Sequence, residues 1–113
     1  MTNLSHGQKA ENIAAQYLKR RGYEVVVQNW KTAHCEIDII AKLKNSMYFV
    51  EVKYRRNTNQ GRGMDYVTPQ KQAQMARAAE SWVQVARWEG DYRLSAIEVS
   101  GENYEVTEFI DDI

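Results

Sequence analysis

The chain has 113 residues, a length that suits one compact domain because it leaves no room for two independent hydrophobic cores. Its single cysteine, Cys35, excludes an internal disulfide framework and is typical of a reducing compartment. The longest apolar runs are only strand-sized, so we expect neither a membrane-spanning helix nor a signal peptide. We therefore expect one cytoplasmic domain over residues 1–113.

The net charge of zero conceals an uneven distribution. Residues 1–88 contain 14 Lys and Arg against 7 Asp and Glu, whereas residues 89–113 contain 1 Arg against 8 acids. A basic part of this kind favours a polyanion such as nucleic acid as the partner. The alternative is that these charges only keep the surface solvated.

The first half of the chain predicts one helix and three strands. Ser5 and Gln8 have the spacing of a capping box, and apolar residues follow them at helical intervals. Gly22 stands where a left-handed residue commonly ends a helix. Three segments rich in β-branched and aromatic residues then predict a three-stranded meander: 23–30, 35–41 and 47–54.

The second half predicts a loop, a helix and two strands. Residues 55–65 are polar, contain two glycines and have no period, which predicts a loop. Thr68 and Pro69 supply an N-cap and a first-turn proline for a helix that we expect to reach Gly90. Its small residues at helical spacing indicate core packing: Ala76, Ala79, Val83 and Ala86. Strands over 92–99 and 104–110 complete an α/β domain with a mixed central sheet flanked by two helices, in the order α-β-β-β-α-β-β.

Charged residues alternate with apolar ones on the second and third strands. Glu36, Asp38 and Ile40 are predicted to share one face, as are Phe49, Glu51 and Lys53. A turn at residues 44–45 sets Asp38 opposite Glu51, and a turn at residues 45–46 sets Asp38 opposite Lys53. Either two-residue turn places Asp38, Glu51 and Lys53 on one side of the sheet.

This arrangement indicates a particular chemistry. Two opposed carboxylates repel each other unless a cation lies between them, and Mg²⁺ characteristically takes one or two carboxylates together with phosphate and water. Lys53 can position a water molecule or offset developing charge. The set Asp38, Glu51 and Lys53 therefore indicates metal-assisted phosphodiester hydrolysis. The alternative is a solvated strand face or a cross-strand ion pair with the same alternation.

A zinc or thiol site is not favoured by the sequence. Residues 34–36 have the His-x-Glu form of zinc deaminases, but the chain lacks the Pro-Cys-x-x-Cys motif that completes such sites. One cysteine and two distant histidines are a poor supply of structural zinc ligands. His34 and Cys35 are neighbours on a strand, so their side chains point to opposite faces and do not form a dyad.

Several segments together resemble the YraN-like family of predicted endonucleases: residues 5–18, Gly22-Tyr23, Asn29-Trp30, residues 36–41, residues 49–53 and the helix that carries Lys71. The resemblance spans most of the chain, from about Gly7 to Trp82. That family is similar to archaeal Holliday-junction resolvases and belongs to the PD-(D/E)XK nuclease superfamily. Two positions differ from its usual pattern, because Cys35 and Ala10 stand where glycine is common. The resemblance implies an αβββαββ, restriction-endonuclease-like domain that hydrolyses DNA, branched DNA included, with Mg²⁺ or Mn²⁺.

The resemblance also implies roles for individual residues. Asp38, Glu51 and the Val52 carbonyl would be metal ligands, and Lys53 would be the catalytic lysine. Glu11 would match an acidic residue on the first helix of the resolvase-like members. The alternative for Glu11 is a first-turn acid stabilised by the helix dipole.

Partners follow from the charges and from the resemblance. Four cationic residues are the predicted contacts to duplex or branched DNA: Arg55, Arg56, Arg62 and Lys71. Similarity to resolvases suggests a homodimer, because symmetric cutting needs two sites. One alternative is an enzyme that acts on RNA. Another is a non-catalytic nuclease-fold module that binds nucleic acid or a protein partner.

Overall fold

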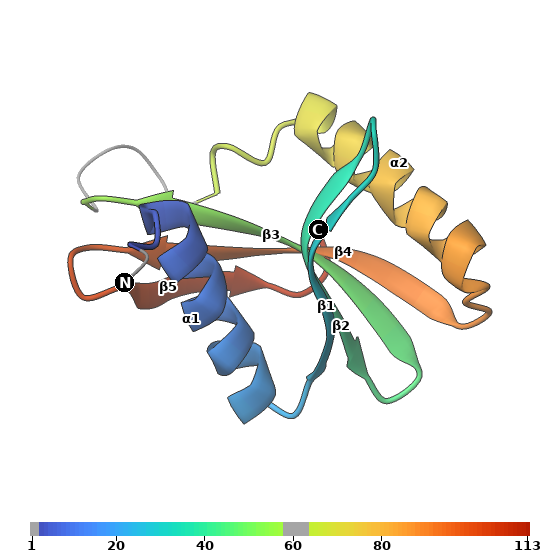
Figure 1. The fold of residues 1–113 in the computed structure, drawn as a ribbon, viewed down its shortest axis with the longest axis horizontal. Coiled ribbons are helices and arrows are strands. Elements are labelled where there is room, and N and C mark those ends of the chain that lie inside the picture. The colour runs from blue at the N-terminus through green and yellow to red at the C-terminus, as the bar shows by residue number, and fades with distance from the viewer. Residues whose placement is uncertain (1–2, 58–63) are drawn as a thin grey trace.

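The computed structural model describes residues 3–57 and 64–113. Within these residues the elements follow the predicted order α-β-β-β-α-β-β (Figure 1). The α/β class with a mixed sheet flanked by two helices is confirmed. The bounds are α1 His6–Arg20, β1 Glu24–Lys31, β2 Glu36–Leu43, β3 Ser46–Arg55, α2 Pro69–Ala86, β4 Asp91–Ser100 and β5 Glu105–Ile110.

The strands form one sheet in the spatial order β1-β2-β3-β4-β5. β1, β2 and β3 are the predicted antiparallel meander, β3 and β4 are parallel, and β5 returns antiparallel to β4. Leu43 lies opposite Ser46, so the β2–β3 turn is at residues 44–45. This confirms the first of the two predicted registers.

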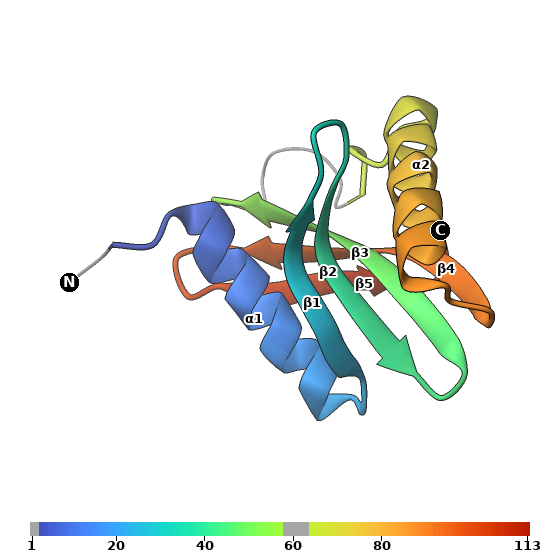
Figure 2. The same cartoon turned by 45° about the vertical axis from the view of Figure 1, so that its right-hand side comes forward.

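The two helices cover opposite faces of the sheet (Figure 2). α1 packs its small residues and Leu18 against Ile39, Val50 and Ile97. α2 packs against Ile40 and Phe49, and its Trp82 ring meets Phe49 edge-on at a centroid distance of 5.6 Å. Burial of each large side chain contributes about 1.5–3 kcal/mol, so the helices hold the sheet from both sides.

The helix ends follow local sequence signals in all but one case. Ser5 makes the predicted capping box with Gln8, and Gly22 is left-handed with φ 93°. Thr68 caps α2, but this helix ends at Ala86 with Arg87 in the left-handed conformation, not at Gly90. Gly90 has another role, because a Cβ there would lie 2.5 Å from the Trp88 ring and 2.8 Å from the Asn45 carbonyl oxygen.

The buried face of α2 also differs from the predicted stripe. Ala79 is fully buried as expected, but Ala76 and Ala86 are exposed. The residues that α2 buries are Met75, Ala78, Ala79 and Trp82. The stripe was misplaced because small residues recur on more than one face of this helix, and the larger Met75 and Trp82 set its orientation.

Neither helix in the described part of the chain is long and apolar enough to cross a membrane.

Candidate active site

β2 and β3 separate at the end that carries the charged residues. Their pairing runs from Leu43 opposite Ser46 to Ile39 opposite Val50. Asp38 is the next residue of β2, and its Oδ2 accepts a hydrogen bond of 2.8 Å from the backbone N–H of Val52. A side chain thus enters the fork between the two strands and satisfies a backbone donor there.

The alternation of β2 is interrupted at Asp38. Ile39 packs on the α1 side, whereas Ile37 and Ile40 both pack on the α2 side. On β1, Asn29 lies between the partners of Ile39 and Ile37 and has a left-handed φ of 56°. The prediction that Glu36, Asp38 and Ile40 share one face is therefore wrong, and Asp38 turns toward α1. Val50 and Val52 pack on the α1 side, so Glu51 and Lys53 lie on the α2 side, and the prediction that Asp38, Glu51 and Lys53 lie on one side of the sheet is wrong as well.

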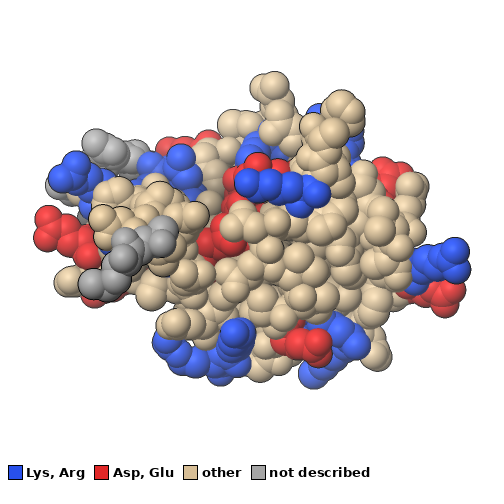
Figure 3. All heavy atoms as spheres, viewed as in Figure 1, with Lys and Arg blue, Asp and Glu red and all other residues tan. Residues whose placement is uncertain are grey.

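The carboxylates open into two adjoining pockets. A pocket of about 430 Å³ on the α1 side is lined by Asp38 together with Glu11, and Val52 also faces it. A pocket of about 530 Å³ on the α2 side is lined by Glu51. Glu36 lines both pockets, so carboxylates are found on both sides of the fork. Acidic side chains also gather near the centre of the face drawn in Figure 3.

The fork is an unfavourable place for negative charge. The pKa of Asp38 is raised to about 7, first by burial and then by the nearby Glu51 charge, and the Val52 hydrogen bond offsets only part of this rise. Glu11 is 8% exposed, and burial likewise raises its pKa against a hydrogen bond with Gln28. A bound cation would relieve the repulsion among these groups.

Oxygen ligands for a hard cation are present, but the carboxylates alone do not complete a site. Among residues 3–57 and 64–113, no three His, Cys, Asp or Glu side chains gather closely enough to hold a metal ion. Mg²⁺ ordinarily uses only one or two carboxylates and completes its shell with water, carbonyl groups and phosphate. Asp38, Glu51 and the Val52 carbonyl are donors of this chemical kind, with Asp38 and Glu11 lining the α1-side pocket and Glu51 the α2-side pocket.

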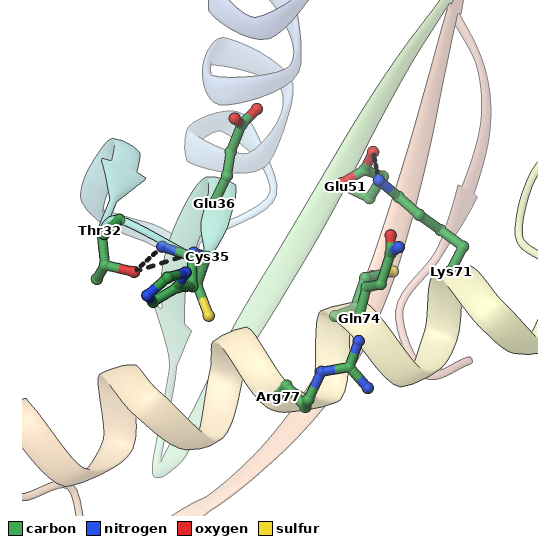
Figure 4. A pocket seen from close by; sticks show the side chains of 10 residues that line it. Thr32, Cys35, Glu36, Glu51, Lys71, Gln74 and Arg77 are labelled. Carbon is green, nitrogen blue, oxygen red and sulfur yellow. Dashed lines mark hydrogen bonds and ion pairs between the residues drawn. The ribbon is translucent and has the colours of Figure 1, made fainter.

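Two lysines approach the site differently. Lys71, in the first turn of α2, places its ammonium group 2.9 Å from Glu51 Oε1 (Figure 4). Lys53 follows Glu51 on the same side of β3, and its exposed ammonium group lies over the Tyr66 ring at 5.9 Å. The Lys71–Glu51 pair was missed from sequence, because only the packing of α2 on the sheet brings these residues together.

The predicted nucleic-acid contacts are dispersed. Arg55 belongs to β3, so the loop was predicted to begin one residue too early. The Arg55 Nε lies 2.6 Å from Glu98 Oε2 in a largely buried ion pair. Arg56 is exposed beyond the strand end, and Arg62 lies outside the described residues. Gln74 and Arg77 line the α2-side pocket beside Lys71. They were not predicted as site residues, because the sequence of a helix does not show which other element each of its faces lies against.

Comparison with known proteins places the chain in a family. Residues 10–99 match the uncharacterised protein family UPF0102. A UPF0102 protein from Chloroherpeton thalassium is 36% identical over 99 residues, which cover 87% of this chain and 77% of the relative. One from Cytophaga hutchinsonii is 31% identical over 106 residues and covers 94% of both chains. The chain therefore belongs to family UPF0102, the YraN-like family that its sequence resembles.

Proposed function

We propose that this protein is an endonuclease that uses Mg²⁺ or Mn²⁺ to hydrolyse phosphodiester bonds in DNA. The observation that carries the proposal is the position of Asp38 and Glu51 at one strand fork, where burial and then the charge of Glu51 raise the pKa of Asp38. A hard divalent cation bound there would neutralise the carboxylates, polarise a phosphate oxygen and lower the pKa of a water ligand.

Individual residues have separate roles in the proposed reaction. Asp38 and Glu51 hold the cation, and the Val52 N–H fixes the orientation of Asp38 while its carbonyl is a further ligand. Lys53, two positions after Glu51, positions the attacking water or offsets charge that develops on the phosphate. Glu11 is an auxiliary acid in the pocket that Asp38 lines.

The expected substrate, compartment and oligomeric state follow from the composition of the chain and from its resemblance to resolvases. The basic part of the sequence favours a nucleic-acid backbone, and DNA, including branched DNA, is the expected substrate. The single cysteine suits the cytoplasm. Symmetric cutting of a branched substrate would need two copies of the site, so we also expect a homodimer, which analytical ultracentrifugation would detect.

Cleavage of labelled substrates tests the proposal. Linear, nicked and four-way DNA, with an RNA duplex in parallel, are incubated with Mg²⁺, Mn²⁺ or EDTA. We expect cleavage of DNA that needs the metal and is lost in Asp38→Asn and Lys53→Ala. Glu24→Gln and Lys19→Ala change exposed residues away from the fork and serve as matched controls.

Other outcomes are equally decisive. Retained DNA binding without cleavage under every metal condition would support a non-catalytic nuclease-fold module instead. Cleavage of RNA alone would redirect the proposal to an RNA enzyme. Cleavage that survives Asp38→Asn would exclude the fork as the active site.

A further inference from the structure

The pocket on the α2 side contains cationic and polar side chains to which the proposed hydrolysis gives no role. It lies between the tip of the β1–β2 hairpin, residues 32–35, and the first half of α2. Its volume of about 530 Å³ is in the range of sites that hold small ligands or a short piece of a larger one. Figures 1 and 2 show the hairpin tip beside α2 from two directions.

The α2 wall of this pocket is cationic and polar. Lys71, Gln74 and Arg77 project from successive turns of α2 into the pocket, and Figure 4 shows them on one side of it. Lysine and arginine bind phosphate as charged donors, and a glutamine amide adds a neutral donor. Glu51 lies at one end of this row, so a phosphate held by the row would adjoin the proposed cation site.

Lys71 connects the row to the cation site. Its ammonium group is 2.9 Å from Glu51, with 35% of the Lys71 side chain and 19% of the Glu51 side chain exposed. A Glu51 carboxylate that coordinates a divalent cation no longer needs the lysine as its counter-ion. The flexible lysine stem then allows the ammonium group to turn toward another anion in the same pocket.

We propose that this pocket binds a phosphate of the substrate strand next to the scissile bond, and that Lys71 moves from Glu51 to that phosphate when Glu51 takes up the divalent cation. The inference rests on the proposed nuclease function and specifies how that site holds its substrate. Gln74 and Arg77 form the rest of the phosphate site, and Lys71 is the exchangeable part. Cation binding and strand binding are therefore cooperative through Lys71.

Cation affinity in the absence of nucleic acid gives the first test. Mn²⁺ is titrated by calorimetry into wild type, Lys71→Met and Arg77→Met, with Lys19→Met as a control at the exposed end of α1. Loss of the competing ammonium group should tighten Mn²⁺ binding to Lys71→Met by about five-fold, the upper range for an ion pair of this exposure. Arg77→Met and Lys19→Met should bind Mn²⁺ as wild type does.

Strand affinity gives the second test. A labelled single-stranded DNA oligonucleotide is bound in EDTA and in Ca²⁺, its intactness checked on a gel, and anisotropy is read at several salt concentrations. Ca²⁺ should strengthen strand binding by wild type about five-fold more than by Lys71→Met. Arg77→Met should lower the slope of log affinity against log salt by about 0.7, the value for one lost phosphate contact.

The outcomes separate this inference from the proposed function. Mn²⁺ that fails to bind wild type would overturn both. Mn²⁺ that binds wild type and Lys71→Met equally, with an unchanged effect of Ca²⁺ on strand binding, would overturn the exchange of Lys71 and leave the nuclease proposal standing. Inorganic phosphate that competes at the same concentration as the oligonucleotide would show a site for free phosphate and overturn the assignment to a strand.

Discussion

The carboxylate of Asp38 accepts the backbone N–H of Val52 at the point where the pairing of β2 with β3 ends. This hydrogen bond fixes the orientation of Asp38 on the α1 side of the sheet and satisfies a backbone donor that the strand ladder leaves unpaired. Asparagine can make the same bond through its amide oxygen, whereas alanine would leave the Val52 N–H without this acceptor. Asp38→Asn is therefore the cleaner substitution, because it removes charge and keeps the geometry.

Stability should depend on pH through Asp38. Its pKa is raised from 3.8 to about 7, so the folded state binds the proton more tightly than the unfolded state does. The stability that this proton contributes is fully present below about pH 4 and is lost as the pH rises through about 7. In EDTA, the free energy of unfolding of wild type relative to Asp38→Asn should fall by about 2–4 kcal/mol between pH 4 and pH 8.

Urea denaturation at each pH measures this difference. Glu24→Gln, an exposed carboxyl at the start of β1, is the control and should follow wild type. A difference between wild type and Asp38→Asn that stays constant from pH 4 to pH 8 would contradict the raised pKa.

Divalent metal should stabilise the folded protein through the same carboxylates. A ligand that binds only the folded state adds about 2.7 kcal/mol at one hundred times its Kd, which raises the Tm of a domain of this size by several degrees. We expect Mg²⁺ or Mn²⁺ to raise the Tm of wild type at pH 8, and excess EDTA to reverse the rise. Glu51→Gln and Asp38→Asn should lose most of the shift, whereas an unchanged shift in Glu51→Gln would place the metal elsewhere.

Local sequence signals accounted for most of the fold. The Ser5 capping box, Thr68-Pro69 and the β-branched runs set the positions of the elements, because each signal acts over a few residues. The two-residue turn at Lys44 and Asn45 fixed the β2–β3 register for the same reason. That register placed Asp38 at the strand level of Glu51, but it did not predict that Asp38 turns to the α1 side while Glu51 faces the α2 side.

Other features depend on packing between distant segments. The approach of Lys71 to Glu51 follows from how Met75 and Trp82 seat α2 on the sheet, and Arg55 meets Glu98 only because β3 and β4 are parallel neighbours. The alternation predicted for β2 is interrupted at Asp38, next to the left-handed Asn29 of β1. None of these has a local signal, since each is decided by contacts with a separate element.

Lys53 should matter for catalysis and little for stability. Its side chain is exposed and its ammonium group lies over the Tyr66 ring, so Lys53→Ala should change the free energy of unfolding by less than about 1 kcal/mol. Loss of one positioned charge donor should lower kcat by about 10²–10³. Single-turnover cleavage with Lys19→Ala as the control measures this, and a Lys53→Ala enzyme within two-fold of wild type would contradict the catalytic role.

Arg55 should matter for stability more than for DNA binding. Its Nε lies 2.6 Å from Glu98, with 16% of the Arg55 side chain and 6% of the Glu98 side chain exposed. Arg55→Gln would leave the buried Glu98 charge without this cation, which typically costs about 3–5 kcal/mol. The matched control is Arg93→Gln, whose pair with Asp91 spans 3.8 Å between side chains that are 43% and 57% exposed.

A double-mutant cycle separates the free energy contributed by the Arg55–Glu98 ion pair from the other effects of replacing Arg55. We expect Arg93→Gln to cost less than about 0.5 kcal/mol in urea denaturation, because an exposed pair contributes little. Glu98→Gln added to Arg55→Gln should recover part of the loss, since both charges are then gone and Thr107 can still donate to the amide oxygen at position 98. Equal stability of Arg55→Gln and Arg93→Gln, with weaker DNA binding only in Arg55→Gln, would instead make Arg55 a nucleic-acid contact, as its sequence position first suggests.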